Sequence, residues 1–347
     1  MKLFEYINKD ELNNAISDKS VKIIKHPVYP ISLISYTKNC CTYGNWNDTT
    51  MKCRGLVYDN TSMDIICIPM RKFFNIEEGY NIHETEDYTI FDKLDGTLCI
   101  LFFYNGEPIV CTKGAFDSVQ SKLAKSIIRA NPVYKDSINS LDTNYTYMFE
   151  LISPADRHVV DYGAEVSMIF IACTDNRTAE DMDIRKINNL YGDIFRIPTI
   201  FESVNWHSIR DQYDGENKEG FVIRFSNGNR IKLKFNEYWH KYGSKNMLSE
   251  RKLIKMKLVD IQFTEAQLES FDEETRLYKD KLETEIEKKV SDILYDALID
   301  YDDTNDIDTI ISEFKKSKYR NILFRLLKSN DIIDVRKNIY RYILTQK

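Results

Sequence analysis

The sequence lacks the features that would place this protein in a membrane, in an oxidising compartment or around a structural zinc ion. No run of about 18 apolar residues occurs, and charges interrupt the start, MKLFEYINKDELNNAI, so we expect neither a membrane span nor an export signal. The seven cysteines, an odd number, include no CxxC pair, which argues against a disulfide framework or a zinc site. The five histidines do not cluster at metal-ligand spacing. We therefore expect a cytoplasmic protein with reduced, mostly buried thiols.

The protein also has no excess of basic residues, and its formal net charge is -6. This balance argues against a protein coated with basic surface, but it leaves room for a nucleic acid held in a local basic groove. With 43% hydrophobic and 29% charged residues, the composition is that of a soluble globular protein. The 347 residues exceed the roughly 250 to 300 at which single cores stop growing, so we predict two domains.

Residues 1–245 show short β-type runs separated by turn signals. The expected strands are RGLVYD, TLCILFFY, PIVCTKG, YTYMFELI, VSMIFIACT, GFVIRF and RIKLKF. Asn105-Gly106 and Asn227-Gly228 favour tight hairpin turns, because both residue types accept positive φ. Residues 117–131 and 179–193 have the apolar spacing of amphipathic helices. These patterns predict an α+β domain built on antiparallel sheets.

Residues 246–347 have helical rather than strand-like spacing, which predicts a smaller all-α C-terminal domain. Residues 271–301 form one long helical pattern with charges between the apolar positions. After an acidic break at residues 300–310, the last stretch is helical and strongly basic from 315 to 341. That basic stretch is either a solvated helix face or an RNA-facing surface in which Lys, Arg and Tyr alternate.

The stretch FDKLDGTLCI, residues 91–100, sets a lysine at the head of an apolar run, where a core strand would gain nothing from the charge. Lys93 therefore either marks the rim of a sheet or takes part in chemistry. We expect Lys93 to lead a strand that turns at Asn105-Gly106 and returns through IVCTKG, which places Lys113 on the neighbouring strand. Glu150 is expected to end a strand between Phe and Leu, where an unpaired charge would be costly.

A second group of charges lies in KEGFVIRFSNGNRIKLKF, residues 218–235. Glu219 starts one strand of the predicted hairpin, and Lys232 and Lys234 share one face of the other strand, opposite the apolar face. Converging lysines and carboxylates suit a nucleoside triphosphate with its metal, because amines neutralise phosphate oxygens and carboxylates hold Mg²⁺. A neutral lysine amine is also a nucleophile.

These residues resemble the covalent nucleotidyltransferases, which include polynucleotide ligases and messenger-RNA capping enzymes and attach a nucleoside monophosphate to the lysine of KxDG. The sequence is most similar to ATP-dependent RNA ligases of the bacteriophage T4 RNA ligase 1 type. The likeness covers most of residues 30–245. It is carried by CRGLVYD at 53–59, PMRKFFNIEE at 69–78, KLDG at 93–96, CTKGA at 111–115, FELISPADR at 149–157, EGFV at 219–222 and KLK at 232–234.

The resemblance implies a role for each matching position. Lys93 would be the adenylylated nucleophile, and Lys232 and Lys234 would contact the α-phosphate. Glu219 would bind the metal together with Glu150, and Glu150 would also contact the ribose. The other implied ATP contacts are Tyr36, Arg54, Lys72 and Lys113 at the β- and γ-phosphates, Asp95 and Gly96 in the KLDG loop, and Phe170 or Ile171 with Val222 around the adenine. The implied cofactors are ATP and Mg²⁺ or Mn²⁺.

The activity implied by the resemblance is ATP-dependent joining of RNA 5′-phosphate and 3′-hydroxyl ends through a lysyl-AMP and an RNA-adenylate. The expected partner is broken transfer RNA whose ends are prepared by a separate end-healing kinase or phosphatase. The protein would be a monomer in the cytoplasm, and if it is viral, in the cytoplasm of the host cell. The alternatives are a DNA ligase, a capping guanylyltransferase and a non-catalytic RNA-end binder. The helical C-terminal domain argues against the first two, because those relatives normally carry a β-barrel domain there. The full set of charged site residues argues against the third.

Overall fold

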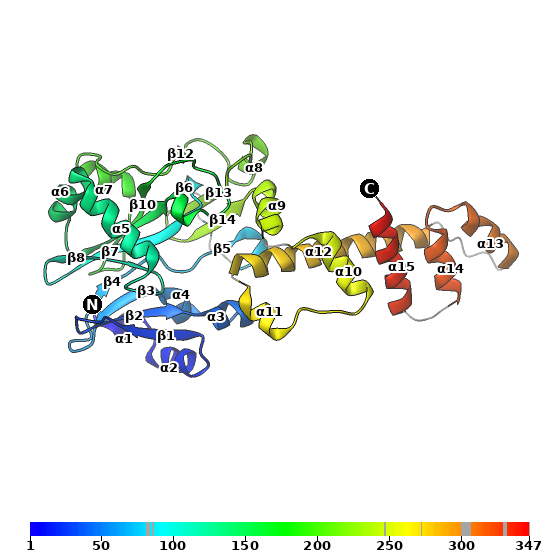
Figure 1. The fold of residues 1–347 in the computed structure, drawn as a ribbon, viewed down its shortest axis with the longest axis horizontal. Helices are drawn as coiled ribbons and strands as arrows, with labels where there is room; N and C mark the ends of the chain where they lie inside the picture. The colour runs from blue at the N-terminus through cyan, green and yellow to red at the C-terminus, as the bar shows by residue number, and fades with distance from the viewer. Residues whose placement is uncertain are drawn as a thin grey trace. The chain divides into compact units, whose positions relative to one another are not determined.

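The computed structural model describes residues 1–80, 84, 87–245, 248–271, 273–299, 307–328 and 332–346. It divides the chain into two compact units, Met1–Lys241 and Tyr242–Lys347. The first unit holds the sheets, and the described part of the second is helical (Figure 1). The predicted α+β fold followed by a smaller all-α region is confirmed. The predicted domain boundary adjoins residues 246–247, which lie outside the described residues, as do His83 and most of the acidic break.

The first sheet is an antiparallel layer with the strand order β1-β2-β3-β4. Short helices accompany it, and their apolar residues Leu3, Leu12 and Ala15 pack on one face of the sheet. Its elements are α1 (Leu3–Tyr6), α2 (Lys9–Ser17), β1 (Val21–Lys25), β2 (Ile31–Tyr36), α3 (Lys38–Tyr43), α4 (Asp48–Lys52), β3 (Arg54–Asp59) and β4 (Ile65–Cys67). The other face, with Leu33 and Val57, packs against the second sheet.

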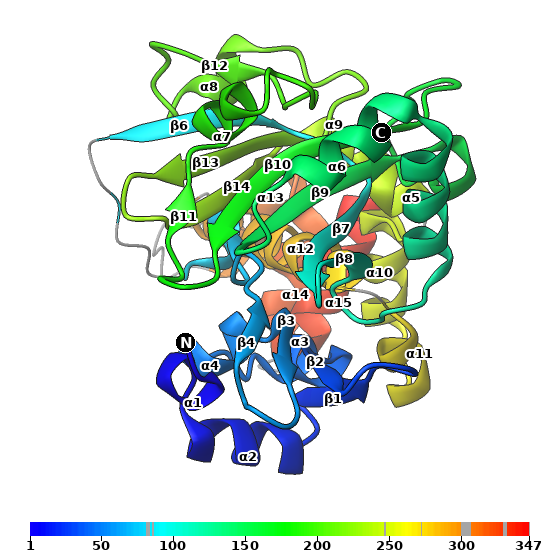
Figure 2. The ribbon, with the colours of Figure 1, turned by 90° about the vertical axis from the view of Figure 1, so that its left-hand side faces the viewer.

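The second sheet has the order β11-β10-β9-β7-β8 and is antiparallel throughout. Figure 2 shows helices lying over the face of this sheet that looks away from the first. The elements are β7 (Thr97–Tyr104), β8 (Glu107–Thr112), α5 (Val119–Ala130), α6 (Pro132–Ser140), β9 (Tyr145–Ile152), η2 (Pro154–Asp156), β10 (Ser167–Asp175), β11 (Asp181–Met182) and α7 (Ile184–Leu190). Alternating side chains therefore face either the helices or the first sheet.

The third sheet has the order β12-β6-β13-β14-β5, and its pairing of β14 with β5 is parallel. This parallel pair joins residues far apart in the sequence and was not expected from the hairpin pattern. The elements are β5 (Phe74–Asn75), η1 (Ile76–Glu78), β6 (Tyr88–Lys93), β12 (Ile200–Phe201), α8 (Ile209–Gln212), β13 (Gly220–Phe225), β14 (Arg230–Lys234) and α9 (Asn236–Lys245). The sheet carries Lys93, Lys232 and Lys234, and Glu219 directly precedes its strand β13.

Three local expectations need correction. Lys93 ends β6 in the third sheet and does not lead β7, which starts at Thr97 in the second sheet, so the KLDG stretch crosses between two sheets. The turn at Asn105-Gly106 is a two-residue turn with positive φ at both residues, as predicted. The second predicted tight turn, at Asn227-Gly228, is instead a longer loop, because the backbone N–H of Phe225 donates to the carbonyl of Asn229. The helix expected over 179–193 is shorter, because its first residues form β11.

The second unit consists of helices in the part of the chain that the structure describes. They are α10 (Glu250–Leu258), α11 (Glu265–Ser270), α12 (Glu273–Ile299), α13 (Ile307–Lys316), α14 (Arg320–Lys328) and α15 (Ile332–Thr345). Leu282, Ile286 and Val290 recur at four-residue spacing along α12 and are buried, which is the apolar stripe expected of a packed helix. Glu287 of α12 pairs with Lys257 of α10 and Arg336 of α15 and so joins three helices.

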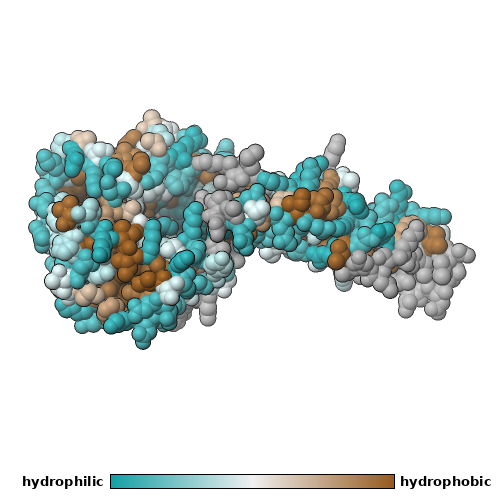
Figure 3. Space-filling view, turned by 60° about the horizontal axis from the view of Figure 1, so that its bottom comes forward, coloured by the Kyte–Doolittle hydropathy of each residue, from teal (hydrophilic) through white to brown (hydrophobic). Residues whose placement is uncertain are grey.

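The surface drawn in Figure 3 is mainly hydrophilic, with scattered apolar patches on each unit. Among the described residues, no helix is both long and apolar enough to cross a membrane. All seven cysteines are free, and six of them are buried, as their apolar surroundings predicted.

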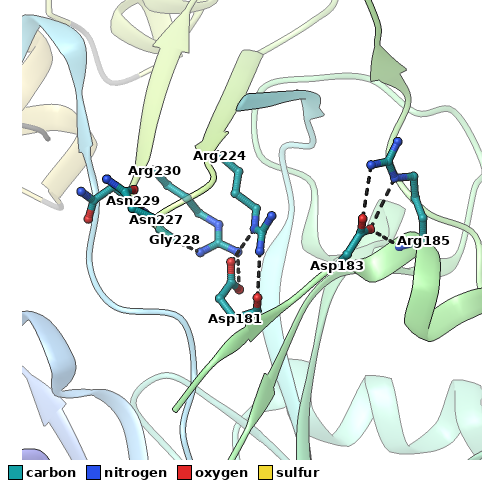
Figure 4. A network of polar contacts seen from close by, with 8 residues as sticks. All are labelled: Asp181, Asp183, Arg185, Arg224, Asn227, Gly228, Asn229 and Arg230. Carbon is teal, nitrogen blue, oxygen red and sulfur yellow. Dashed lines mark hydrogen bonds and ion pairs between the residues drawn. The ribbon is translucent and has the colours of Figure 1, made fainter. Parts of the chain in front are cut away.

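Ion pairs join the second sheet to the third at the far end of the β13–β14 hairpin, and we call the three side chains Asp181, Arg224 and Arg230 the charged latch (Figure 4). Asp181 of β11 accepts hydrogen bonds from Arg224 of β13 and from Arg230 of β14, the latter at 2.7 Å. The side chains of Asp181, Arg224 and Arg230 are 17%, 18% and 8% exposed. Two largely buried guanidinium groups therefore share one largely buried carboxylate. Nearby, Asp183 and Arg185 form a simpler and more exposed pair.

We predict that Asp181→Asn lowers the free energy of unfolding by about 3 kcal/mol, because two poorly solvated guanidinium groups lose their counter-charge. Asp183→Asn, which keeps the side-chain oxygen that caps α7, should lower it by less than about 1 kcal/mol, as for an exposed pair. Urea unfolding of the three proteins measures the difference. Equal effects of the two substitutions would contradict the latch.

Candidate active site

Three adjacent strands bring Lys93, Glu219 and Lys234 together. Gly220, the first residue of β13, lies in register with Lys93 of β6 on one side and with Lys234 of β14 on the other. The Oε1 atom of Glu219 accepts from the Nζ atoms of Lys93 at 2.7 Å and of Lys234 at 2.8 Å. The side chains of Glu219 and Lys234 are 3% and 0% exposed, whereas that of Lys93 is 16% exposed. Lys93 is thus the member of the trio that a ligand can reach most easily.

Gly220 is required by this convergence. Its φ is +149°, and a Cβ atom built there would lie 2.1 Å from the carbonyl oxygen of Leu233 and 2.7 Å from the Cα atom of Lys234. Both neighbours are backbone atoms of a paired strand, which cannot move aside without breaking the ladder. Any larger residue would push β14 away from β13 and separate Lys234 from Glu219.

The second carboxylate oxygen of Glu219, Oε2, is buried and has no hydrogen-bond partner among the described residues. Buried polar atoms are nearly always satisfied, so an orphaned carboxylate oxygen indicates a missing ligand. A metal ion or its water is a suitable one, because Mg²⁺ prefers carboxylate oxygen. The described residues contain no group of three or more His, Cys, Asp or Glu side chains placed to hold a metal alone. A cation at Glu219 would therefore need ligands from water and substrate.

Glu150 lies within β9, two residues before its end, on the face of the second sheet opposite the helices. Its Oε1 accepts a hydrogen bond from the backbone N–H of Gly96 at 3.0 Å. Burial raises the pKa of Glu150 to about 7, the charge of Lys93 opposes this rise, and the charge of Glu219 adds to it. Glu150 is thus electrostatically coupled to the Lys93–Glu219 pair.

The residues of the KLDG loop are held by the protein itself. A Cβ atom at Gly96 would lie 2.3 Å from the carbonyl oxygen of Leu151, so glycine is needed for contact with β9. Asp95 accepts from the N–H groups of Val159 at 2.7 Å and Val160 at 2.8 Å, and from the hydroxyl of Tyr238 at 2.9 Å. Both carboxylate oxygens of Asp95 thus have partners within the chain. The arrangement favours an anchoring role over the nucleotide contact that the resemblance implied.

A chain of aromatic rings lies between Lys113, which follows β8, and Lys72, which lies between β4 and β5. Lys113 donates to the hydroxyl of Tyr36 at 3.0 Å, and the Tyr36 ring lies 5.0 Å from that of Trp46. Trp46 in turn lies 5.5 Å from Phe74, and the Nζ atom of Lys72 is 4.7 Å from the Phe74 ring centroid. Lys72 is 4% exposed, and lysine is seldom buried so deeply unless it is paired.

Phe73 occupies the corresponding place between Arg54 and Lys232. The guanidinium carbon of Arg54 lies 5.6 Å and the Nζ atom of Lys232 lies 5.1 Å from the centroid of its ring. Rings attract cations without neutralising them, and an anionic ligand can add to these contacts. The sequence argument missed Trp46, Phe73 and Tyr238 as site residues; only Phe73 lay in a motif that could have revealed it.

One predicted adenine contact is wrong. Phe170 is 0% exposed and packs with Phe149 and Phe195 in the core beneath the helices. It lies in register with Phe149, the neighbour of Glu150, so strand alternation turns it away from the site. Its neighbour Ile171, at a bulge in β10, is only partly buried. Val222 is half-buried in register with Lys232 and remains an adenine candidate.

The raised pKa of Glu150 predicts a pH-dependent stability. Between pH 4.5 and about 7 the folded protein binds a proton at Glu150 that the unfolded chain has lost, so the free energy of unfolding falls as the pH rises through this window. Glu150→Gln should remove that decline. The free energy of unfolding of the variant minus that of the natural protein should therefore rise by about 1–3 kcal/mol from pH 5 to pH 8. Urea unfolding at several pH values measures it. A constant difference across this range would contradict the prediction.

Comparison with known proteins connects this geometry to a family. A viral relative, described as a bifunctional polynucleotide kinase/RNA ligase of Autographa californica nuclear polyhedrosis virus, is 28% identical over 153 residues, which cover 38% of this chain and 22% of that protein. The Naegleria gruberi RNA ligase with pyrophosphate has 16% identity and a TM-score of 0.39, covering 45% of this chain and 52% of that one. An archaeal ATP-dependent RNA ligase has 13% identity and a TM-score of 0.47, covering 83% and 81%.

The family itself is shown by a sequence model. The model of the RNA ligase family matches residues 52–247, which is more than half of the chain and includes all but one of the predicted site residues, Tyr36. The chain belongs to the RNA ligase family of the bacteriophage T4 RNA ligase 1 type.

Proposed function

We propose that this protein is an ATP-dependent RNA ligase that works through a lysyl-AMP intermediate on Lys93. The observation that carries the proposal is the buried Glu219, which holds Lys93 and Lys234 with one oxygen and leaves the other without a partner. Cations supported by aromatic rings lie around it. Such a site suits a polyanion with a metal, and the nucleophile is already in position.

In the first step Lys93 must lose its ammonium proton before it can attack the α-phosphorus of ATP. The N–P bond forms as the bond from the α-phosphorus to the bridging oxygen breaks, pyrophosphate departs with the electron pair, and the nitrogen releases a second proton. Lys232 and Lys234 would neutralise charge on the α-phosphate. Tyr36, Arg54, Lys72 and Lys113 would hold the departing pyrophosphate.

The metal proposed here is Mg²⁺ or Mn²⁺; a mutant of the Naegleria gruberi ligase has been solved with ATP and Mn. Glu219 would hold it through the orphaned Oε2 atom, with Glu150 near by, and a divalent ion would supply charge neutralisation at the phosphates. A cation at Glu219 also competes with the ammonium form of Lys93 for the same carboxylate. Glu219 would therefore bring metal binding and deprotonation of the nucleophile together.

The next two steps would use RNA. A 5′-phosphate oxygen attacks the α-phosphorus of the adduct, the N–P bond breaks, and Lys93 takes up protons again. A 3′-hydroxyl then attacks the 5′-phosphorus, loses its proton and releases AMP. Both steps are phosphoryl transfers that require position and charge neutralisation, so one set of cations can serve all three.

The first prediction concerns the nucleophile. Incubation with Mg²⁺ and α-labelled ATP should leave a covalent label that survives denaturing electrophoresis. Lys93→Ala should abolish this label, because Lys234, the other lysine in contact with Glu219, is fully buried. Lys218→Ala removes an exposed neighbouring lysine and should keep the label. A label that persists in Lys93→Ala would refute the assignment. Labelling by GTP instead of ATP would indicate a capping guanylyltransferase.

The proposed natural substrate is broken transfer RNA. The viral relative is described as combining a polynucleotide kinase with an RNA ligase, and on that ground we propose that a separate kinase or phosphatase prepares the ends. The helical unit would select the RNA. In its basic stretch Arg325 and Arg336 pair with acids, whereas Lys315, Lys316 and Arg320 are exposed.

The second prediction concerns RNA binding. Reversing the charges of Lys315, Lys316 and Arg320 to Glu should weaken RNA binding and flatten the dependence of log K on log salt by about 0.7 per lost phosphate contact. Self-adenylylation should persist. The matched control reverses Lys19, Lys22 and Lys25, which are exposed in the first unit. If both triple variants lose RNA affinity equally, the effect is one of net charge, and the proposed surface is wrong.

A further inference from the structure

Asn75 is a buried residue of the site to which no role has yet been given. It ends β5 and lies in register with Lys232 in the parallel pair that closes the third sheet. Lys232 is in turn opposite Val222, and Val222 is opposite Phe91. Residues that pair across a sheet share a face, so Asn75 extends the row that contains the proposed adenine and α-phosphate contacts. Its exposed fraction is 2%.

The orientation of the Asn75 amide is fixed by Glu78. One oxygen of Glu78, Oε1, accepts from the backbone N–H of Asn75 at 2.7 Å and from its side-chain Nδ2 at 2.8 Å. Only the nitrogen end of the amide can donate, so it must face Glu78, and the carbonyl end must point elsewhere. That carbonyl oxygen, Oδ1, is buried and has no partner among the residues described.

An unsatisfied buried carbonyl is destabilising. Asn75 is the N-cap residue of η1, and its side chain and that of Glu78 form a capping box, but the Oδ1 atom of Asn75 has no hydrogen-bond partner among the described residues. The cap by itself therefore does not satisfy this acceptor. The acceptor sits beside a lysine that we propose to contact phosphate, which indicates that a ligand supplies the missing donor.

We propose that the Oδ1 atom of Asn75 accepts a hydrogen bond from an O–H group of the metal–nucleotide substrate. Phosphate is excluded as the partner, because ionised phosphate oxygens are acceptors and would be repelled by a carbonyl. The remaining donors close to phosphates are water bound to the metal, since Mg²⁺ keeps several waters, and the hydroxyl groups of the ribose. The inference rests on the proposed function and adds a residue that positions the substrate in the same site.

The test is calorimetric binding to full-length protein carrying Lys93→Ala, which prevents turnover, with and without Asn75→Leu. Leucine keeps the volume but removes the acceptor. We expect Asn75→Leu to weaken binding of ATP with Mg²⁺ about tenfold, the loss of one hydrogen bond. Binding of metal-free pyrophosphate, measured at a pH at which it is fully ionised so that it has neither hydroxyl groups nor metal-bound water, should not change. Asn75→Ala repeats the test should leucine prevent folding, and thermal unfolding checks both variants.

Ligand choice separates the two donors. If metal-bound water is the donor, the loss appears for ATP and for pyrophosphate with Mg²⁺ and disappears in EDTA. If a ribose hydroxyl is the donor, the loss persists for ATP in EDTA and disappears for 2′-deoxy-ATP or 3′-deoxy-ATP. Glu78→Gln keeps an oxygen that accepts from Asn75 and should bind all ligands nearly as the parent does.

Two outcomes would overturn the inference alone. One is an equal loss for every ligand, including metal-free pyrophosphate, which would indicate a general distortion of the site. The other is no loss for any ligand. A parent protein that neither binds ATP nor acquires the covalent label would instead refute the proposed function, and this inference with it.

Discussion

The shared ion pair of Glu219 with Lys93 and Lys234 is the contact on which the site depends. It forms because Gly220 allows β14 to approach β13 so closely that both lysines reach one carboxylate oxygen. Two lysine side chains share one carboxylate oxygen in a largely buried place. The arrangement therefore favours a negatively charged ligand, and it leaves the Oε2 atom of Glu219 for a second cation.

Aromatic rings support the remaining cations. Arg54, Lys72, Lys113 and Lys232 all lie over aromatic rings, and Lys234 also contacts Tyr238 and Trp239. Rings hold the side chains in position while preserving the field that attracts and neutralises a triphosphate. This explains why a protein of net charge -6 can still form a strongly cationic site.

The sequence predicted half of the strands found among the described residues, namely β3, β7, β8, β9, β10, β13 and β14, because each is a β-prone run next to a clear turn signal. Lys232 was correctly expected on the face opposite Ile231, because side chains alternate along a strand. The prediction that Lys93 leads β7 is wrong because the apolar run after Gly96 looks continuous with the lysine, although the chain changes sheets there. Phe170 was misassigned because its register with Phe149, which turns it toward the helices, cannot be read from either strand alone.

By itself the sequence determined the antiparallel α+β character of the first unit, the helical character of the second, and the order of the motifs, because periodicity and motif spacing are local properties. The tertiary structure alone decided which of these residues meet. The convergence of Lys93 and Glu219, the anchoring of Asp95 by Tyr238 and the parallel pairing that buries Asn75 all join segments far apart in the chain. Such contacts depend on strand register and on close packing, which a one-residue shift would change and which no local pattern specifies.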